Sequence, residues 1–438
     1  MKEYAITIFV SVLALSSYAW DRSNTHINYF IDTSTTISEN LAPTKNIHIN
    51  DQGNFLVKYP EGDTEKKHGY TDEKLWKASS PINVIVKSGV EIKAEVNSPN
   101  AGAIVDATFQ VGKANLTFEG NNIITASQMI LSDRANVYAE NTTINLTSSS
   151  DKQGLRFSTD GCKAVFKGGQ LNAKSVYVQD DSGNLTFDGT NVTLESITAP
   201  GALSSSSPTQ FKIVLKNNAS LTLTEEERVY DYNTNSANSK FDGKIIVEDG
   251  STIKSTNEYY KLASIAGISV SGSGSSIEVY NVVSKNEISV DSGAKIKADK
   301  VSASDIFVGS DSSLAATTSM KVENLLSVAS DSTVSAKDIS FEKLIVNFAE
   351  DFVKGESASV DLNSIFGSST TVVLAALNSG KEFSVSDSHS EWNLDSVTFG
   401  PDGNVSFVVG SQVVPEPATY AAIFGALALA FAAYRRRK

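Results

Sequence analysis

Apolar and polar residues alternate along most of the chain between Pro81 and Phe348. An alternating segment leads into a turn of Asp, Ser, Gly or Asn, and a second alternating segment follows. One clear copy consists of Ile288–Val290, the turn Asp291–Ala294 and Lys295–Ala298. Alternation with a period of two is typical of β-strands that bury one face. The pattern therefore predicts a body of short strands joined by tight turns.

This strand–turn–strand unit recurs at a nearly constant interval along the sequence. The last apolar residues before successive turns are separated by 23, 20, 18 and 20 residues, and they are Val247, Val270, Val290, Val308 and Val328. A period near 20 residues indicates stacked repeats, because one repeat cannot bury its apolar face alone. We therefore predict an all-β fold, a parallel (right-handed) β-helix or solenoid, over residues 81–350.

A tandem array of β-sandwiches is the main alternative, since sandwich strands also alternate and turn every ~8–12 residues. The repetition of one phrase, the few prolines and the near absence of large aromatic core residues favour the solenoid. The period breaks down between Ser204 and Ser239. There, the acidic run Thr224–Arg228 and the polar stretch Tyr230–Lys240 predict an excursion loop.

Two stretches that flank the repeats have a different character. Residues 20–80 are predicted to form an N-terminal cap region, which would cover strand edges that a solenoid otherwise exposes. Residues 351–412 are predicted to form a C-terminal β cap. In this cap, the apolar run Thr370–Leu377 predicts a buried strand, and Phe399–Phe407 predicts a hairpin around Gly400–Gly403.

The N-terminus has the features of a secretory signal peptide. Tyr4–Leu15 is mostly apolar, Lys2 precedes it, and the small residues Ser17 and Ala19 follow at the spacing of a cleavage site. We therefore predict a signal helix within residues 1–19. The alternative is a buried N-terminal helix or strand.

The C-terminus combines three unlike elements. Pro415, Glu416 and Pro417 break the chain, since the prolines block helix propagation backwards. The uncharged segment Ala418–Tyr434 follows, and the basic residues Arg435, Arg436, Arg437 and Lys438 end the sequence. Residues 419–434 predict a transmembrane helix about 24 Å long, slightly short of the ~30 Å hydrocarbon core. The terminal cations predict a cytoplasmic end.

Residues 413–438 resemble the PEP-CTERM sorting signal of bacterial exported proteins, in which the same three elements occur in this order. The resemblance implies recognition by an exosortase, a membrane cysteine enzyme that processes the tail near Pro415–Pro417. It also implies an envelope of the Gram-negative type and association with extracellular polysaccharide or biofilm matrix. Unrelated proteins share this tail, so it does not indicate the activity of the body. An ordinary C-terminal anchor is the alternative.

Composition and charge narrow the possible functions. The formal net charge is -13, and no long basic run precedes Arg435, which argues against a nucleic-acid partner. Cys162 is the only cysteine, so an intramolecular disulfide is impossible. The four histidines lack metal-ligand spacing, and no H-E-x-x-H, G-x-S-x-G or phosphate-binding glycine motif occurs. We expect no catalytic residues, no metal and no cofactor.

The leading prediction is an exported structural or adhesive β-solenoid, anchored transiently by its C-terminal helix and then held at the cell surface or in the extracellular matrix. The alternative is a polysaccharide lyase or hydrolase on the same scaffold, with candidates Asp180, Asp181, Asp188, Arg134 and Arg156. Aspartates in turns more often serve backbone geometry. A groove with clustered carboxylates and Arg or Lys would favour the enzyme, and a uniform Ser/Thr/Asn face would favour the structural role. An autotransporter-type passenger is disfavoured, because we expect no β-barrel after the repeats.

Overall fold

The computed structural model describes residues 28–31, 34–39, 41–44, 46–50, 82–94, 108–112, 114–148, 154–158, 161–179, 182–199, 209–224, 239–256, 259–388 and 390–413. The chain divides into two compact units. Unit 1 comprises Met1–Ser269 with Gly274–Val283, and unit 2 comprises Val270–Ser273 with Ser284–Lys438. Two strands include residues of both units, β24 (Gly267–Ser271) and β26 (Asn281–Ser284).

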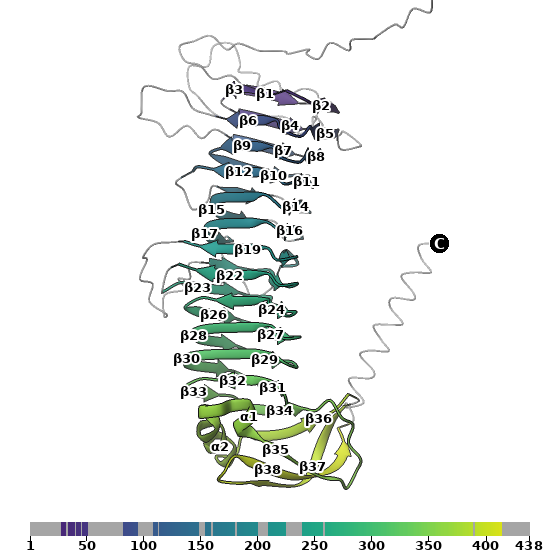
Figure 1. Ribbon diagram of the computed structural model, residues 1–438, viewed down its shortest axis with the longest axis vertical. Coiled ribbons are helices and arrows are strands. Elements are labelled where there is room, and N and C mark those ends of the chain that lie inside the picture. Colours follow the sequence, from purple (N-terminus) through teal and green to yellow (C-terminus); the bar gives the residue numbers. More distant parts are fainter. Residues whose placement is uncertain are drawn as a thin grey trace, which may run out of the picture. The chain divides into compact units, whose positions relative to one another are not determined.

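Three ladders of parallel strands build unit 1 (Figure 1). Ladder 1 contains β1 (Asn28–Ile31), β4 (Asn46–Asn50), β7 (Thr108–Gly112), β10 (Gln128–Ser132), β13 (Leu155–Phe157), the second halves of β15 (Gln170–Val178) and β17 (Asn191–Thr198), β20 (Ser239–Phe241) and β23 (Lys261–Ser264). Ladder 2 contains β2 (Thr35–Ile37), β5 (Ile82–Val86), β8 (Ala114–Glu119), β11 (Asn136–Glu140), β14 (Lys163–Lys167), β16 (Asn184–Asp188), β18 (Lys212–Lys216) and β21 (Lys244–Val247). Ladder 3 contains β3 (Leu41–Thr44), β6 (Glu91–Ala94), β9 (Ile123–Ala126), β12 (Thr143–Leu146), the first halves of β15 and β17, β19 (Ser220–Leu223), β22 (Thr252–Ser255) and β25 (Ser276–Glu278).

The parallel ladders show a mostly β fold with parallel sheets, which is consistent with the predicted all-β parallel solenoid. A β-sandwich consists of antiparallel sheets, and the described strands of unit 1 pair in parallel. The prediction that large aromatic residues are nearly absent from the core was wrong. Phe157, Phe211 and Phe241 are fully buried, and the ring of Phe211 lies 5.0 Å and 5.9 Å from the other two ring centroids.

The strands of residues 28–50 differ from the predicted N-terminal cap. β1, β2 and β3 pair in parallel with β4, β5 and β6, so they form a regular rung of the three ladders. Polar and apolar residues alternate along Asn46–Asn50, and this segment forms β4, which pairs with β7 in the next rung. The mixed polarity of residues 20–80 concealed this rung, and residues 51–81 lie outside the described part of the chain.

The predicted irregular stretch 204–239 also contains regular strands. β18 and β19 pair with β16 and β17 at the same positions as their neighbours in ladders 2 and 3. Lys212–Lys216 and Ser220–Leu223 both show strict alternation of buried and less buried residues, which explains this pairing. The acidic residues Glu225–Glu227 lie outside the described residues, so the loop prediction stays a prediction there.

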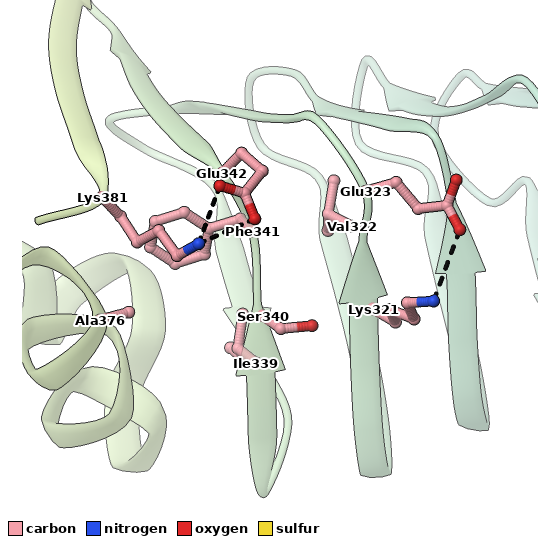
Figure 2. A pocket seen from close by; sticks show the side chains of 9 residues that line it. All are labelled: Lys321, Val322, Glu323, Ile339, Ser340, Phe341, Glu342, Ala376 and Lys381. Carbon is pink, nitrogen blue, oxygen red and sulfur yellow. Dashed lines mark hydrogen bonds and ion pairs between the residues drawn. The ribbon is translucent and has the colours of Figure 1, made fainter. Parts of the chain in front are cut away.

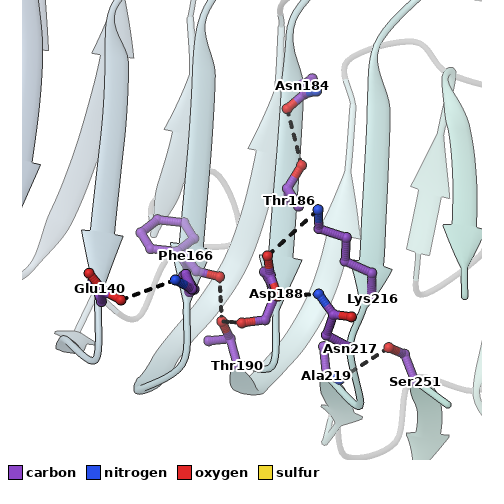
Figure 3. Close-up of polar contacts among 11 residues, drawn as sticks. Glu140, Phe166, Asn184, Thr186, Asp188, Thr190, Lys216, Asn217, Ala219 and Ser251 are labelled. Carbon is purple, nitrogen blue, oxygen red and sulfur yellow. Dashed lines mark hydrogen bonds and ion pairs between the residues drawn. The ribbon is translucent and has the colours of Figure 1, made fainter. Parts of the chain in front are cut away.

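The turn between ladders 2 and 3 is the Asp/Ser/Gly/Asn turn expected from the sequence. Asn121, Asn141 and Asp249 have φ values of 52°, 45° and 53°, a left-handed conformation that Asn and Asp tolerate. A buried polar residue follows each turn. Thus the Ser251 hydroxyl accepts a hydrogen bond at 3.1 Å from the Ala219 N–H, one rung earlier (Figure 3).

Unit 2 repeats the parallel arrangement. One ladder contains β27 (Glu287–Asp291), β29 (Asp305–Val308), β31 (Leu325–Ala329), β34 (Lys343–Asn347) and β36 (Glu382–Ser386). The long strands β28 (Lys295–Ala303) and β30 (Ser313–Val322) pair along both halves, and β32 (Thr333–Ser335) and β33 (Asp338–Ser340) follow β30. Val290, Val308 and Val328 lie directly opposite one another, which confirms the period in this part.

The C-terminal part of unit 2 corrects the β-cap prediction. The run predicted as a strand, Thr370–Leu377, lies in α2 (Thr370–Asn378), which follows α1 (Leu362–Phe366) and the 3₁₀ helix η1 (Gly367–Ser369). Thr370, Val373, Leu374 and Leu377 are buried, which is the i, i+3, i+4, i+7 spacing of a helix. A short apolar run cannot be assigned to strand or helix by periodicity alone.

The two helices contact β32 and β33, the strands that pair with β30. The Ser369 hydroxyl accepts a hydrogen bond from the Ala336 N–H at 2.9 Å and donates one to the Ala336 carbonyl at 2.7 Å. Both residues are buried, so a side chain satisfies backbone groups that follow β32. Neither helix of the described residues is long and apolar enough to cross a membrane.

The predicted hairpin is present at the end of unit 2. β37 (Glu391–Phe399) and β38 (Asn404–Gln412) are antiparallel, with Phe399 opposite Val405, and β38 also pairs with β35 (Ser357–Asp361). Hydrogen bonds from Asn404 to the Asp402 carboxylate lower the pKa of Asp402 below its ordinary value. The hairpin predicted around Gly400–Gly403 is therefore confirmed.

Candidate functional surfaces

The residues predicted for export lie outside the described part of the chain. They are the signal-cleavage residues Ser17 and Ala19, the sorting motif Pro415, Glu416 and Pro417, and the basic end Arg435, Arg436, Arg437 and Lys438. Two enzyme candidates, Asp180 and Asp181, also lie outside it. The predictions for all of these residues remain predictions.

Asp188, a third enzyme candidate, ends β16 and is held by two neighbours on the next rung. The Asn217 side-chain N–H donates to Oδ1 of Asp188 at 2.7 Å, and Lys216 Nζ lies 3.6 Å from Oδ2 (Figure 3). Asp188 therefore belongs to a structural network at the ladder 2 turn. This is the backbone and turn role that the sequence favoured for such aspartates.

The arginine candidates lie elsewhere in unit 1. Arg134 is exposed in a left-handed turn with φ 61°. Arg156 lies in β13 of ladder 1, where its Nε and Nη2 donate to the Gln179 side-chain oxygen at 3.1 and 2.5 Å. Its guanidinium also lies 5.7 Å from the ring centroid of Tyr177. Among the described residues, no hydrogen bond or ion pair joins either arginine to Asp188, and Arg156 and Asp188 belong to different ladders.

Charged residues at the ends of the ladder 2 strands form ion pairs between rungs. Lys87 Nζ lies 2.8 Å from Glu119, and Lys167 Nζ lies 3.2 Å from Glu140. The hydrogen bond to the Glu140 carboxylate, together with its negative charge, raises the pKa of Lys167 above its ordinary value. These pairs are exposed, and exposed pairs contribute little to stability. Their effect is to neutralise this edge of ladder 2.

Ladder 3 of unit 1 carries a face of uncharged polar side chains. Along β12, the first halves of β15 and β17, and β19, the residues that alternate with the core bear hydroxyl or amide groups: Thr143, Asn145, Gln170, Asn172, Asn191, Thr193, Ser220 and Thr222. Their side chains are exposed or half-buried. Further along β15 and β17, Lys174 and Glu195 form an ion pair at 3.0 Å. Asn172 donates to Asn145 at 2.8 Å, and Ser220 donates to Asn191 at 2.8 Å, each across one rung. We call these eight residues the neutral face.

Unit 2 contains a shallow groove of about 400 Å³ (Figure 2). It is lined by Lys321, Val322, Glu323, Ile339, Ser340, Phe341, Glu342, Ala376 and Lys381. Lys381 Nζ donates to both Glu342 carboxylate oxygens at 2.8 Å, and Lys321 Nζ lies 3.4 Å from Glu323. The groove thus has the residue types that would favour an enzyme, but each carboxylate is already paired with a lysine.

The described residues offer no group of three or more His, Cys, Asp or Glu side chains that could hold a metal ion. Cys162 is fully buried in unit 1. Sequence reasoning missed the neutral face, because its residues become neighbours only when the register of the rungs is known. The triplets Asn-x-Thr and Ser-x-Thr at Asn191–Thr193 and Ser220–Thr222 were the available signal. No protein-family model matches the chain, and neither a curated protein nor a solved structure matches it significantly.

Proposed function

We propose that this chain is an exported, non-catalytic structural or adhesive protein that acts at the cell surface or in the extracellular matrix. In this proposal its body is a right-handed β-solenoid closed by the helical and hairpin elements of residues 351–412. A signal peptide over residues 1–19 directs export. A transmembrane helix over residues 419–434 anchors the chain until an exosortase processes it near Pro415–Pro417.

The neutral face is the observation that carries the non-catalytic part of the proposal. Hydroxyl and amide groups repeat along it at the rung spacing of about 4.8 Å. They offer hydrogen-bond donors and acceptors to a polymer or a second surface. None of the eight residues is a carboxylic acid, a histidine, a lysine or a cysteine. The partnered positions of Asp188 and Arg156 further support this proposal over a lyase or hydrolase built on those residues.

Replacement of Pro415, Glu416 and Pro417 by alanine tests the export and sorting part. We expect the variant to remain in the membrane fraction unprocessed, because the exosortase would lose its recognition element. The wild-type chain should lose its tail and reach the cell surface or the matrix. Immunoblotting of membrane, surface and medium fractions measures both outcomes.

The matched control replaces Gln412, an exposed residue three positions before the motif, by alanine. This control should be processed as the wild-type chain is. Normal processing and delivery of the triple-alanine variant would refute the sorting proposal.

A further inference from the structure

The first outward residues of the ladder 2 strands form a column without carboxylates. In register, this column contains Asn83, Asn115, Asn136, Lys163, Asn184, Lys212 and Lys244. The asparagines at its beginning bond to one another: Asn115 donates to Asn83 at 2.9 Å, and Asn136 donates to Asn115 at 2.9 Å. We call it the amide–lysine column.

The lysines of this column differ from those at the other edge of the same strands. Lys167 and Lys216 lie four residues after Lys163 and Lys212, and both are paired with carboxylates of neighbouring rungs. Lys163 and Lys212 are exposed, and neither has an ion-pair partner among the described residues. Lys212 lies directly opposite Lys244, and like charges opposite one another on a sheet are destabilising. The column therefore contains three lysines and no carboxylate, although the net charge of the chain is -13.

Apolar side chains lie beside the column. Val165 and Val214 are half-buried and follow Lys163 and Lys212 by two residues on the same outward face, with Thr186 on the rung between them. Valine side chains next to ammonium and amide donors suit a sugar ring with an apolar face and a charged substituent. Carboxylates do occur nearby: Asp133 and Asp242 lie at the corner before these strands, and Asp242 is buried.

From this arrangement we infer that the amide–lysine column binds an acidic, carboxylate-bearing polysaccharide that runs across the rungs of ladder 2. The inference rests on the proposed function, because the chain would meet such a polymer only after export. Lysines on successive or alternate rungs, about 4.8 Å apart per rung, suit a polymer with spaced charges. Duplex DNA carries one charge per about 1.7 Å, which is much denser than the spacing of these lysines. The column also lacks arginine, the residue best suited to phosphate.

Binding of the full-length protein to polygalacturonate tests the inference, with the methyl-esterified polymer as the uncharged probe. We expect the wild-type chain to bind polygalacturonate, to bind the ester more weakly, and to lose affinity as salt is raised. The double variant Lys163→Gln/Lys212→Gln should bind polygalacturonate about tenfold more weakly, because two exposed ammonium groups of the column are lost.

The matched control is Lys295→Gln/Lys300→Gln, which removes the same charge from two exposed lysines of β28. It should bind as the wild type does, and circular dichroism should show the same strand content in all three proteins. Equal affinity of the Lys163/Lys212 variant and the wild type would overturn the inference, as would equal loss in the control. Stronger binding of duplex DNA than of polygalacturonate would also overturn it. Shortening of the polymer would instead contradict the proposed non-catalytic function. The affinities of the variants would still test the binding inference independently.

Discussion

Buried polar side chains at the turn between ladders 2 and 3 join one rung of unit 1 to the next. The Ser275 hydroxyl accepts a hydrogen bond at 3.0 Å from the N–H of Gly250, whose left-handed φ is 77°. Asn122 likewise accepts one at 2.9 Å from the N–H of Val90, which follows the left-handed Gly89. At each of these two turns, a buried side chain of the following rung thus satisfies a backbone N–H group.

Ser275→Ala is expected to destabilise unit 1 by about 1 kcal/mol, because the N–H group of the half-buried Gly250 would lose its acceptor. The adjacent Ser276 is half-buried on the outer face of β25, and Ser276→Ala serves as the control, with an expected change below about 0.5 kcal/mol. Denaturant unfolding of the two variants measures the difference. Equal midpoints would show that the buried hydroxyl has no such role.

At the scale of elements, the helices of unit 2 cover strands whose edges would otherwise lack partners. α1 begins after Asp361, whose carboxylate accepts a hydrogen bond from the Asn363 N–H at 2.9 Å, and so caps the helix. α2 then contributes Val373, Leu374 and Leu377 to the buried core. An unpaired strand edge invites association with other chains, so these helices limit aggregation as well as adding apolar burial.

Val373→Ala should destabilise unit 2 by about 2–3 kcal/mol, because it removes two fully buried methyl groups and leaves a cavity. Val353 is 69% exposed in the same unit, and Val353→Ala should change stability by less than about 0.5 kcal/mol. Thermal unfolding monitored by circular dichroism separates the two. A similar loss in both variants would contradict the packing assigned to α2.

Several elements of this fold could be predicted from the sequence because they depend on local patterns. The alternation at Ile288–Val290 and the turn signal at Gly400–Gly403 identified strands and a hairpin correctly. The run Thr370–Leu377 was wrongly predicted as a strand, because its apolar residues fit the spacing of a strand and of a helix equally well. Only its packing in the folded chain distinguishes the two. The neutral face and the amide–lysine column could not be seen, because Lys163 and Lys212 are 49 residues apart and become near neighbours only through the register of β14, β16 and β18.

At the scale of the whole molecule, outward strand faces rather than an enclosed pocket carry the proposed function. Unit 1 presents the neutral face on ladder 3 and the amide–lysine column on ladder 2, while the whole chain has a net charge of -13. The groove of unit 2, where Glu342 and Lys381 pair, is the location at which we test the competing polysaccharide-cleaving activity. These two surfaces give the competing functions distinct locations.

A crystal structure of the full chain with a carboxylated oligosaccharide distinguishes these two functions. We expect an intact oligosaccharide on the outer face of unit 1, with its carboxylates near Lys163 and Lys212, and no sugar in the groove of unit 2. A shortened oligosaccharide bound between Glu323, Glu342 and Lys381 would refute the non-catalytic proposal and establish the groove as a catalytic site.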